Sequence, residues 1–297
     1  MMTKYHIGTL DEEGKAALAG EDVQPELGAK PGPVFLESRS WKKALLHSKS
    51  IVSWDTRVFT FKLEHEAQTL GLPTGQHLMI RLRDPVTREA IIRSYTPISE
   101  TSKAGFVDVL VKVYFDTKEQ KGGRMSQAME SLPIGHFVDI KGPIGKFEYL
   151  GGGVCTVQGA RRSIKHFVMI CGGSGITPIY QVLRAIMQNK SDPTRCTVLD
   201  GNRLVEDILC KADMDGYARD NVDRCKLLYT LTKAPDDWTG LKGRIAAPLL
   251  AEHASKAVIG VAEGEAMCLI CGPEALEKSC HKALLDLGWK DDEMLFF

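Results

Sequence analysis

A glycine-rich segment directly after an apolar stretch is the first feature of this sequence that could do chemistry. It reads CGGSGITP over residues 171–178, HFVMI precedes it, and an amphipathic stretch follows. Glycines let the main chain approach a ligand closely, and the free N–H groups at the start of a helix attract anions. We therefore expect a strand, a phosphate-binding turn and a helix, with Thr177 as N-cap and Pro178 at the first helical position. Pro178 stands where the dinucleotide fingerprint has its third glycine, so a tight turn without a ligand is the alternative.

Two further segments could together hold a second phosphate group. Arg93 and Tyr95 in RSYTPIS would share one face of a strand, and a guanidinium is a planar fork for phosphate. GGRMS, residues 122–126, precedes a helix predicted to begin at Ser126, whose N-terminus would attract an anion. Taken alone, each segment has a plainer interpretation: an exposed arginine beside a packed tyrosine, and a serine N-cap after a turn. Together they supply an arginine clamp and a helix N-terminus for one pyrophosphate.

Cys268 and Cys271 form a C-x-x-C pair in AMCLIC, an apolar run that leads to Gly272 and Pro273. Such a pair can bind zinc or undergo dithiol redox chemistry. The run is typical of a strand, however, and side chains three positions apart in a strand face opposite sides of the sheet. No second pair is present, so we predict no metal site. Cys271 would stand at the carboxyl end of a parallel strand, where ligands bind; a buried cysteine before a turn is the alternative.

The elements that must position these residues follow from a change of pattern along the chain. Between about residues 44 and 148, short stretches rich in β-branched and aromatic residues predict several strands and one helix, which favour a small antiparallel barrel. From about residue 165, strand-like and helix-like stretches alternate, as in a parallel sheet with helices on both faces. The stretch 9–34 has linker composition and suggests a fragment of a larger protein. We expect a hinge over 1–37, a barrel domain over 38–155 and an α/β domain over 156–297.

The composition of the chain indicates which binding partners and which cellular compartment to expect. The chain has 38 basic and 38 acidic side chains, so no overall field attracts nucleic acid or an anionic membrane. No run approaches the roughly 18 apolar residues of a membrane span, and the start of the chain lacks an apolar signal stretch. Eight dispersed cysteines, several of them in apolar stretches, are typical of reduced thiols in the cytoplasm. We predict a cytoplasmic protein with no nucleic-acid or membrane partner.

Several motifs in register resemble those of one family. RSYTPIS, VKVYF, GGRMS, GPIGKFEY, GGSGITP and CGP make the chain, over about residues 40–297, similar to the cytochrome b5 reductase family within the ferredoxin–NADP reductase superfamily. YHIGTLDEE and the ending MLFF also resemble the reductase fragment of the assimilatory nitrate reductases of fungi and algae. No H-P-G-G haem-ligand motif is present, which agrees with a fragment that lacks the haem domain. The resemblance implies an antiparallel Greek-key β-barrel that binds FAD, followed by a parallel-sheet α/β domain that binds NADPH or NADH.

The resemblance also implies roles for individual residues. Three are implied to be catalytic: Cys271, which would orient the nicotinamide, Lys112, and Thr96 near the flavin N5. The residues implied at the flavin are Arg93, Ser94, Tyr95, Thr96, Leu110, Lys112, Phe115, Gly123, Arg124, Met125, Ser126 and Thr177. Those implied at the pyridine nucleotide are Gly172, Gly173, Gly175, Arg203, Thr232, Lys233, Cys271, Gly272 and Pro273. Leu276 stands where the family often has Met, a volume-conserving change.

The activity implied by the resemblance is electron transfer from a nicotinamide through a flavin. NAD(P)H would give a hydride to FAD, and electrons would then pass singly to a cytochrome b5-type haem in the same full-length protein, for nitrate reduction. A free-standing NADH–cytochrome b5 reductase is one alternative, which the linker at 9–34 disfavours. A nucleotide-binding regulatory module that has lost its flavin is another, and Arg93, Tyr95 and GGRMS argue against it.

The choice between NADPH and NADH depends on a departure from the family. NADH-specific relatives carry an Asp after the third α/β strand, in a stretch like YTLD, whereas this chain has Thr232 followed by Lys233. Arg203, at the end of the preceding strand, adds a positive group. Without a carboxylate to repel the 2′-phosphate, we expect NADPH to be used well. The alternative is that Lys233 points to solvent and Thr232 is neutral to both coenzymes.

Overall fold

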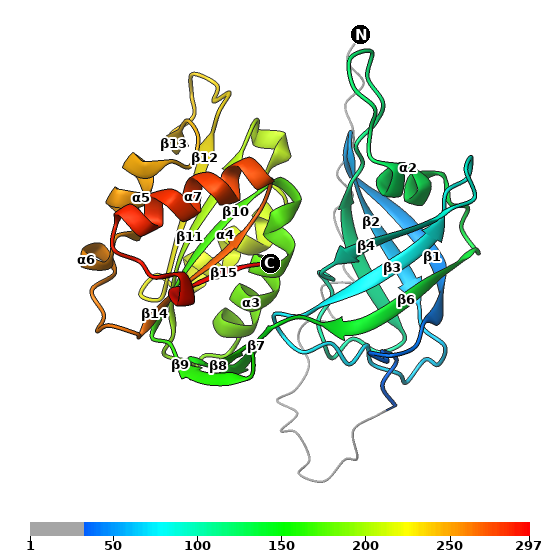
Figure 1. Ribbon diagram of the computed structural model, residues 1–297, viewed down its shortest axis with the longest axis horizontal. Helices are drawn as coiled ribbons and strands as arrows, with labels where there is room; N and C mark the ends of the chain where they lie inside the picture. The colour runs from blue at the N-terminus through cyan, green and yellow to red at the C-terminus, as the bar shows by residue number, and fades with distance from the viewer. Residues whose placement is uncertain (1–32) are drawn as a thin grey trace, which may run out of the picture. The chain divides into compact units, whose positions relative to one another are not determined.

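The computed structural model of the protein describes residues 33–297, which contain two six-stranded sheets joined by a small three-stranded one (Figure 1). The first large sheet is antiparallel throughout and has the strand order β4-β3-β6-β1-β2-β5, so β6 is inserted between β3 and β1. Beyond β4, the N–H of Ile98 donates to the carbonyl of Asp108 in β5, which brings the two edges of the sheet together. The strands are β1 (Lys42–Ser53), β2 (Thr56–Lys62), β3 (His77–Arg83), β4 (Ala90–Tyr95), β5 (Phe106–Lys112) and β6 (Phe137–Ile144).

The inside of this antiparallel sheet is filled by large apolar side chains. Alternate residues of β2 and β3 point inward, among them Phe59, Phe61 and Ile80, and all three are fully buried. Helix α2 (Arg124–Ser131) packs on β3 and β4 through Met125 and Met129. This core explains the alternating pattern in the sequence, and the predicted antiparallel β-domain is confirmed.

The last residues of the expected hinge and the expected domain boundary both lie in the part of the chain that the structure describes. Residues 1–32 of the hinge lie outside the described residues. Phe35, in its last part, is fully buried in the core of the antiparallel sheet, and its N–H donates to Thr69 O at 2.9 Å. The boundary expected after residue 155 falls inside β8, the middle strand of the small sheet formed by β7 (Phe147–Gly151), β8 (Val154–Val157) and β9 (Ala160–Ser163).

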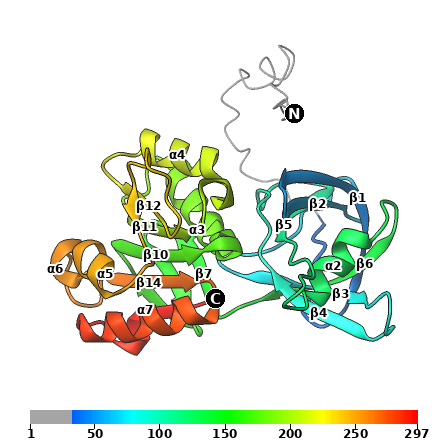
Figure 2. The ribbon, with the colours of Figure 1, turned by 90° about the horizontal axis from the view of Figure 1, so that it is seen from above.

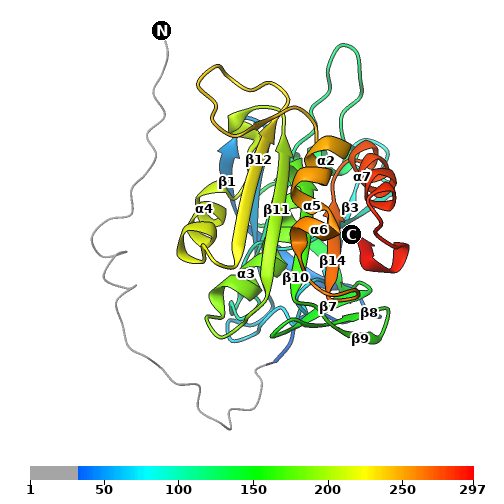
Figure 3. The same ribbon diagram turned by 90° about the vertical axis from the view of Figure 1, so that its left-hand side faces the viewer.

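The second large sheet is parallel and has the strand order β13-β12-β11-β10-β14-β15. Figure 3 shows β12, β11, β10 and β14 side by side. From β10 the chain first adds strands on one side and then returns to add β14 on the other, so the topological switch lies between β10 and β14. The strands are β10 (His166–Gly172), β11 (Arg195–Asn202), β12 (Cys225–Leu231), β13 (Leu241–Lys242), β14 (Ala266–Cys271) and β15 (Met294–Phe296).

Helices cover both faces of the parallel sheet, as the alternation in the sequence predicts (Figure 2). Phe167, Met169 and Cys171 of β10 face the side of α3 and α4, whereas Val168 and Ile170 face the side of α5, α6 and α7. The helices are α3 (Ile176–Gln188), α4 (Lys211–Asp220), α5 (Ala247–Ala254), α6 (Lys256–Ile259) and α7 (Glu274–Asp286), with short 3-10 turns η1 (Gly173–Gly175), η2 (Val205–Asp207) and η3 (Asp291–Glu293). Within residues 33–297 no helix is both long enough and apolar enough to cross a membrane.

Candidate active site

A cavity of about 1300 Å³ is lined by residues of both large sheets, and the switch point between β10 and β14 opens into it. The structure brings together at this cavity every residue that the sequence analysis assigned to a cofactor, with two exceptions. The exceptions are Phe115 and Lys233. Phe115 instead packs beside Trp54, with the ring centroids 6.5 Å apart, and Lys233 is an exposed residue of the turn after β12. The lining is therefore composed of segments that are far apart in the sequence.

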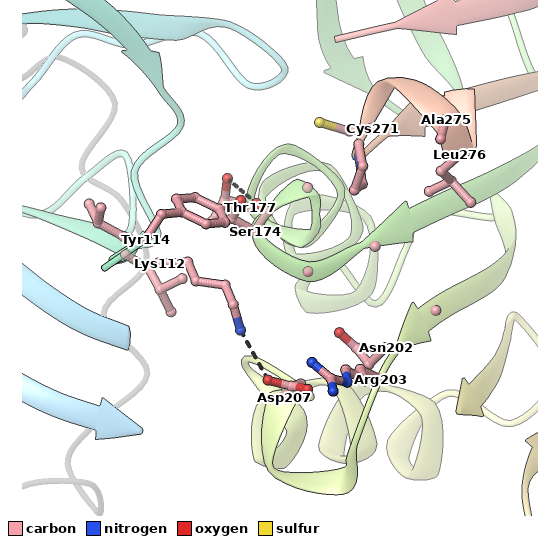
Figure 4. Close-up of a pocket in the computed structure, with 18 of the residues that line it drawn as sticks. Lys112, Tyr114, Ser174, Thr177, Asn202, Arg203, Asp207, Cys271, Ala275 and Leu276 are labelled. Atoms are coloured by element: carbon pink, nitrogen blue, oxygen red, sulfur yellow. Dashed lines mark hydrogen bonds and ion pairs between the residues drawn. The ribbon is translucent and has the colours of Figure 1, made fainter. Parts of the chain in front are cut away.

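The glycine-rich segment forms the predicted turn, but the helix begins slightly earlier than expected. Gly175 occupies the N-cap of α3, so Thr177 is the second helical residue and not the cap. Thr177 Oγ1 donates to the carbonyl of Ser174 at 3.2 Å (Figure 4). Pro178 follows as the third residue, where its missing N–H costs no intrahelical hydrogen bond. The prediction chose Thr177 because threonine is a common N-cap residue. In the structure the 3-10 turn η1 runs directly into α3, so the helix begins right after Gly175.

Two of these glycines are required by the backbone. Gly173 has φ +57°, the left-handed region that L-residues with side chains avoid. At Gly175 a Cβ would lie 2.2 Å from the carbonyl oxygen of Cys271, so the turn after β10 packs directly on the end of β14. The absence of a side chain at Gly175 thus allows two segments that line the cavity to pack together at the switch point.

Gly175→Ala should therefore destabilise the protein and loosen the binding of nucleotide. Overpacking against main chain costs about 1–3 kcal/mol, because neither backbone segment can move far. The matched control is Gly216→Ala in α4, where a Cβ would meet nothing closer than 3.8 Å and alanine favours the helix. Thermal unfolding checks both variants; equal midpoints would contradict the assigned packing.

GGRMS, residues 122–126, leads into helix α2 as predicted. The helix begins at Arg124, however, and not at Ser126. Ser126 Oγ instead accepts the N–H of Tyr114 and donates to the carbonyl of Gly123, both at 3.1 Å, which ties the helix to the chain after β5. The Arg124 guanidinium bonds Asp84 and Glu89 on a neighbouring loop. Hydrogen bonds from main-chain N–H groups of that loop, together with Arg124, lower the pKa of Asp84 to about 2. Any contribution of Arg124 to an anion site is thus expected from its main-chain N–H in the first turn of α2.

Arg93 and Tyr95 lie next to each other at the cavity on β4, an edge strand. The exposed Arg93 guanidinium donates to the carbonyl of Ile92 at 2.7 Å and, among residues 33–297, forms no ion pair. The ring of Tyr95 packs on the barrel core, and this burial raises the pKa of its hydroxyl well above the usual range. An uncompensated guanidinium beside a neutral phenol fits an anionic ligand with an apolar part.

Lys112 joins the two sheets electrostatically at the cavity. Its ammonium lies 2.8 Å from Asp55 Oδ2 and 3.0 Å from Asp207 Oδ1, the latter bond shown in Figure 4. Burial alone would lower the pKa of Lys112, but the hydrogen bonds to the two carboxylates raise it, so the amine stays charged. Its charge is neutralised by these partners, and it is therefore suited to fixing geometry more than to attracting an anion.

Cys271 and Cys268 occupy different environments, as the strand argument predicts. Cys271 lies at the end of β14 with its sulfur pointing into the cavity (Figure 4), whereas Cys268 is fully buried among residues of α5, α7 and β10. Burial and the nearby Glu277 raise the pKa of the Cys271 thiol to about 12, so it is a neutral group at physiological pH. Among residues 33–297, no group of three or more His, Cys, Asp or Glu side chains is arranged to hold a metal ion.

A separate part of the cavity is basic. Arg203 and Thr232 lie side by side there, because the N–H groups of Thr232 and Lys233 donate to the carbonyls of Asn202 and Arg203. Arg244, in the loop before α5, also lines this part and was missed by the sequence analysis. Neither Arg203 nor Arg244 forms an ion pair with any residue of 33–297, so both guanidiniums are available to an anion.

The sequence analysis missed other lining residues as well. They include Trp54, Asp55, Asn202, Asp207, Arg244 and Ala246. For Asn202 and Arg244 a signal exists, since Asn202 ends β11, Arg244 follows β13, and ligands bind at this edge of a parallel sheet. Strand β13, which precedes Arg244, has only two residues and gives no periodic pattern. Asp55 and Asp207 carry no local signal, because their role depends on meeting Lys112.

Comparisons with known proteins agree with this two-part site. Residues 43–149 match the family described as "Oxidoreductase FAD-binding domain", and residues 169–282 match "Oxidoreductase NAD-binding domain". The fold and the site thus define a class: a two-domain oxidoreductase that uses FAD and a pyridine nucleotide. Both predicted cofactors are confirmed at this level.

Individual relatives narrow the class. The chain is 56% identical over 299 residues to the nitrate reductase [NADPH] of Leptosphaeria maculans and 55% identical over 297 residues to that of Aspergillus niger. In each case all of this chain matches 33% of the relative, so the chain spans about a third of these proteins. The crystal structure of the cytochrome b5 reductase domain of Ulva prolifera nitrate reductase matches 89% of this chain and 100% of that one, at 35% identity and a TM-score of 0.81. This chain belongs to the family of cytochrome b5 reductase domains of nitrate reductases.

Proposed function

We propose that this chain is the electron-entry part of a nitrate reductase, which oxidises NADPH on FAD and passes electrons to a cytochrome b5-type haem domain of the same full-length protein. The observation that carries the proposal is one shared cavity, which is lined both by the glycine-rich turn after β10 and by residues of β4 and α2. The reductases that this chain matches are about three times its length, which supports haem and nitrate sites elsewhere in the protein.

The residues at the cavity fit two cofactors. Two helix N-termini, those of α2 and α3, open into it from different domains, and each leaves main-chain N–H groups without intrahelical partners. Leu110 and Leu276 contribute apolar surface to the lining of the same cavity. We propose that Arg93, Tyr95 and the first turn of α2 hold FAD, and that Gly172, Gly175 and the first turn of α3 hold the pyridine nucleotide.

The chain's own residues supply binding and orientation. FAD, when bound, can take two electrons from a nicotinamide and release them one at a time. The ion pairs of Lys112 with Asp55 and Asp207 fix the distance between the two domains at the cavity. Arg184 of α3 reinforces this contact by donating to the carbonyls of Ile98 and Ser99, each at 2.6 Å. Cys271 presents a neutral thiol that orients the nicotinamide without adding charge.

An apolar rim beside the cavity supports the proposed partner. Trp54 and Tyr114 line the cavity on the side of the antiparallel sheet, and their side chains are 69% and 54% exposed. Phe115 adjoins Trp54 and is also exposed. Large exposed apolar side chains that adjoin one another mark interaction sites, so we propose that the haem domain approaches here.

The test is to purify the chain and record its visible spectrum before and after NADPH. We expect flavin bands that NADPH bleaches, followed by reduction of an added cytochrome b5-type domain and no reduction of nitrate. A colourless protein that still binds NADPH would show a regulatory module instead. A yellow protein that oxidises NADPH but leaves cytochrome b5 oxidised would contradict the proposed partner and leave the flavin reductase intact.

The two cysteines of β14 test the orientation of the nicotinamide. Cys271→Ser should lower turnover roughly 10- to 100-fold while FAD stays bound, since small misplacements of reacting groups are costly. Cys268→Ser should leave turnover unchanged and cost about 1–3 kcal/mol of stability, because it buries a hydroxyl. Steady-state kinetics and thermal unfolding measure both, and indistinguishable variants would refute the assignment.

We also propose that the protein works in the cytoplasm. All eight cysteines are free thiols, and six of them are buried. Such use of cysteine as a small core residue supports a reducing compartment.

A further inference from the structure

A row of side chains crosses the parallel sheet directly beneath the nucleotide end of the cavity. Tyr229 of β12, Asp200 of β11, Cys171 of β10 and Cys271 of β14 are successive neighbours in the strand register. In-register neighbours in a parallel sheet point to the same face. Cys271 lines the cavity, and the row continues from it into the interior under the glycine-rich turn.

Asp200 is the unusual member of this row. It is 1% exposed, yet it has no cationic partner among residues 33–297. The thiol of Cys171 donates to Asp200 Oδ1 at 3.5 Å, and Oδ2 has no hydrogen-bond partner in the described part of the chain. An isolated carboxylate is strongly disfavoured in such a place, so the fold requires a carboxyl that can hold a proton.

Within residues 33–297 the groups around Asp200 are mainly further acids; Lys211 lies over the ring of Tyr229, but its charge is paired with Asp215. The titratable groups that face it are Cys171, Cys271, Tyr229 and Cys210, and behind these lie Asp213 and Asp215. The two outer aspartates accept hydrogen bonds from Tyr180 and Tyr229, respectively. Arg184 acts on Cys210 but is bonded to main-chain carbonyls of the barrel. Burial accordingly raises the pKa of Asp200 to about 7, and the hydrogen bond from Cys171 and the nearby amide of Asn202 oppose the shift.

Asn202 connects this carboxyl to the cavity. It lies two residues further along β11, on the same face, and it lines the cavity. Figure 4 shows its side-chain oxygen pointing into the open space. Its Nδ2 is buried, without a partner at hydrogen-bonding geometry among residues 33–297. The Asn202 side chain thus lies beside the buried acid and also lines the space where the nucleotide would lie.

We propose that Asp200 is a positioning residue of the nucleotide site, and that binding of the pyridine nucleotide is coupled to the uptake of one proton by its carboxyl. The inference rests on nucleotide binding at this cavity, as proposed above.

The coupling follows from what each form of the carboxyl can do. A neutral carboxyl donates its proton to the Asn202 carbonyl, so the amide turns and presents Nδ2–H to the anionic ligand. An ionised carboxyl attracts Nδ2 inward, leaves an acceptor oxygen in the cavity, and adds a negative charge below the phosphates. Binding also removes water and strengthens the preference for the neutral form. A proton taken from solvent on binding is returned when the nucleotide leaves.

The experiment is calorimetric titration of the FAD-loaded protein with NADP⁺ from pH 6 to pH 8. Because the 2′-phosphate itself titrates, the quantity to follow is the Kd of wild type divided by the Kd of Asp200→Asn. This ratio should rise roughly tenfold over the two units, and titrations in buffers of different ionisation enthalpy should show uptake of up to one proton in wild type alone. Asp215→Asn is the matched control, since that carboxyl bonds Tyr229 away from the cavity and should leave the coupling unchanged.

Infrared spectra and unfolding measurements remain informative if the Asp200→Asn variant binds FAD poorly. Infrared difference spectra of wild type should show the carbonyl band of a protonated acid, which is lost as pH rises and regained when NADP⁺ is added. Since the folded protein holds this proton more tightly than the unfolded chain, the free energy of unfolding of wild type relative to that of Asp200→Asn should also fall as pH rises from about 4 to about 7. A Kd ratio that does not vary with pH, or proton uptake that persists in Asp200→Asn, overturns the proposal. Failure to bind NADP⁺ at any pH would instead refute the nucleotide site itself.

Discussion

Thr232→Asp should shift the coenzyme preference towards NADH roughly 100-fold, measured as the ratio of kcat/KM for NADPH to that for NADH. Thr232 lies at the basic part of the cavity beside Arg203, and Arg244 also lines it. A new carboxylate there would repel a 2′-phosphate and pair with the arginines that would otherwise hold it. Juxtaposed like charges cost several kcal/mol, and about 3 kcal/mol corresponds to the stated factor.

The neighbouring residue provides the control for this switch. Lys233 is exposed and does not line the cavity, so Lys233→Asp makes a larger change in charge and should move the ratio little. Arg244→Ala should lower kcat/KM for NADPH and spare NADH. A wild-type protein that strongly prefers NADH, or a Thr232→Asp variant with an unmoved ratio, would show that this part of the cavity does not read the 2′-phosphate.

Arg93→Ala should release FAD roughly 10- to 100-fold more readily. The guanidinium lines the cavity with no acidic partner in residues 33–297, and a charge-assisted hydrogen-bond pair with phosphate is worth about 1.5–3 kcal/mol. The measurement is the Kd of FAD for the apoprotein, followed by quenching of flavin fluorescence.

Arg83→Ala is the matched variant for flavin release. Arg83 ends the neighbouring strand β3, is exposed, bonds only the carbonyl of Arg88 within the described residues, and does not line the cavity. It should therefore retain FAD as wild type does. If Arg93→Ala retains the flavin equally well, Arg93 is an ordinary strand residue and the pyrophosphate is held elsewhere.

Local chemistry explains why much of this fold could be predicted. Alternation of apolar residues in VFTFK and the 3.6-residue period after Gly175 are properties of neighbouring residues, and each favours one element almost independently of the rest. The order of such elements limits the topology, because parallel strands need helical crossovers. The glycine-rich turn was found for the same reason: a left-handed residue such as Gly173 must be marked in the sequence itself.

Predictions that required one specific partner were less complete. The helix starts were each misplaced by two residues, at Ser126 and Thr177, because a hydroxyl near a helix end can bond a loop instead of capping. Lys112 lines the cavity, as its assignment to the cofactor site requires, but its two carboxylate partners were not foreseen. Phe115 and Lys233 belong to the right loops, yet their side chains turn away from the cavity.

The sequence by itself thus determined the order of the elements, the two glycine-bearing turns and the resemblance to a family of flavin reductases, since these depend on residues close together in the chain. The tertiary structure alone decided which charges meet. Lys112 and Asp207 are 95 residues apart, and Asp200 acquires its unusual proton affinity only from the strands and helices that exclude water around it. Contacts and burial of this kind arise from packing over the whole fold, which no local pattern encodes.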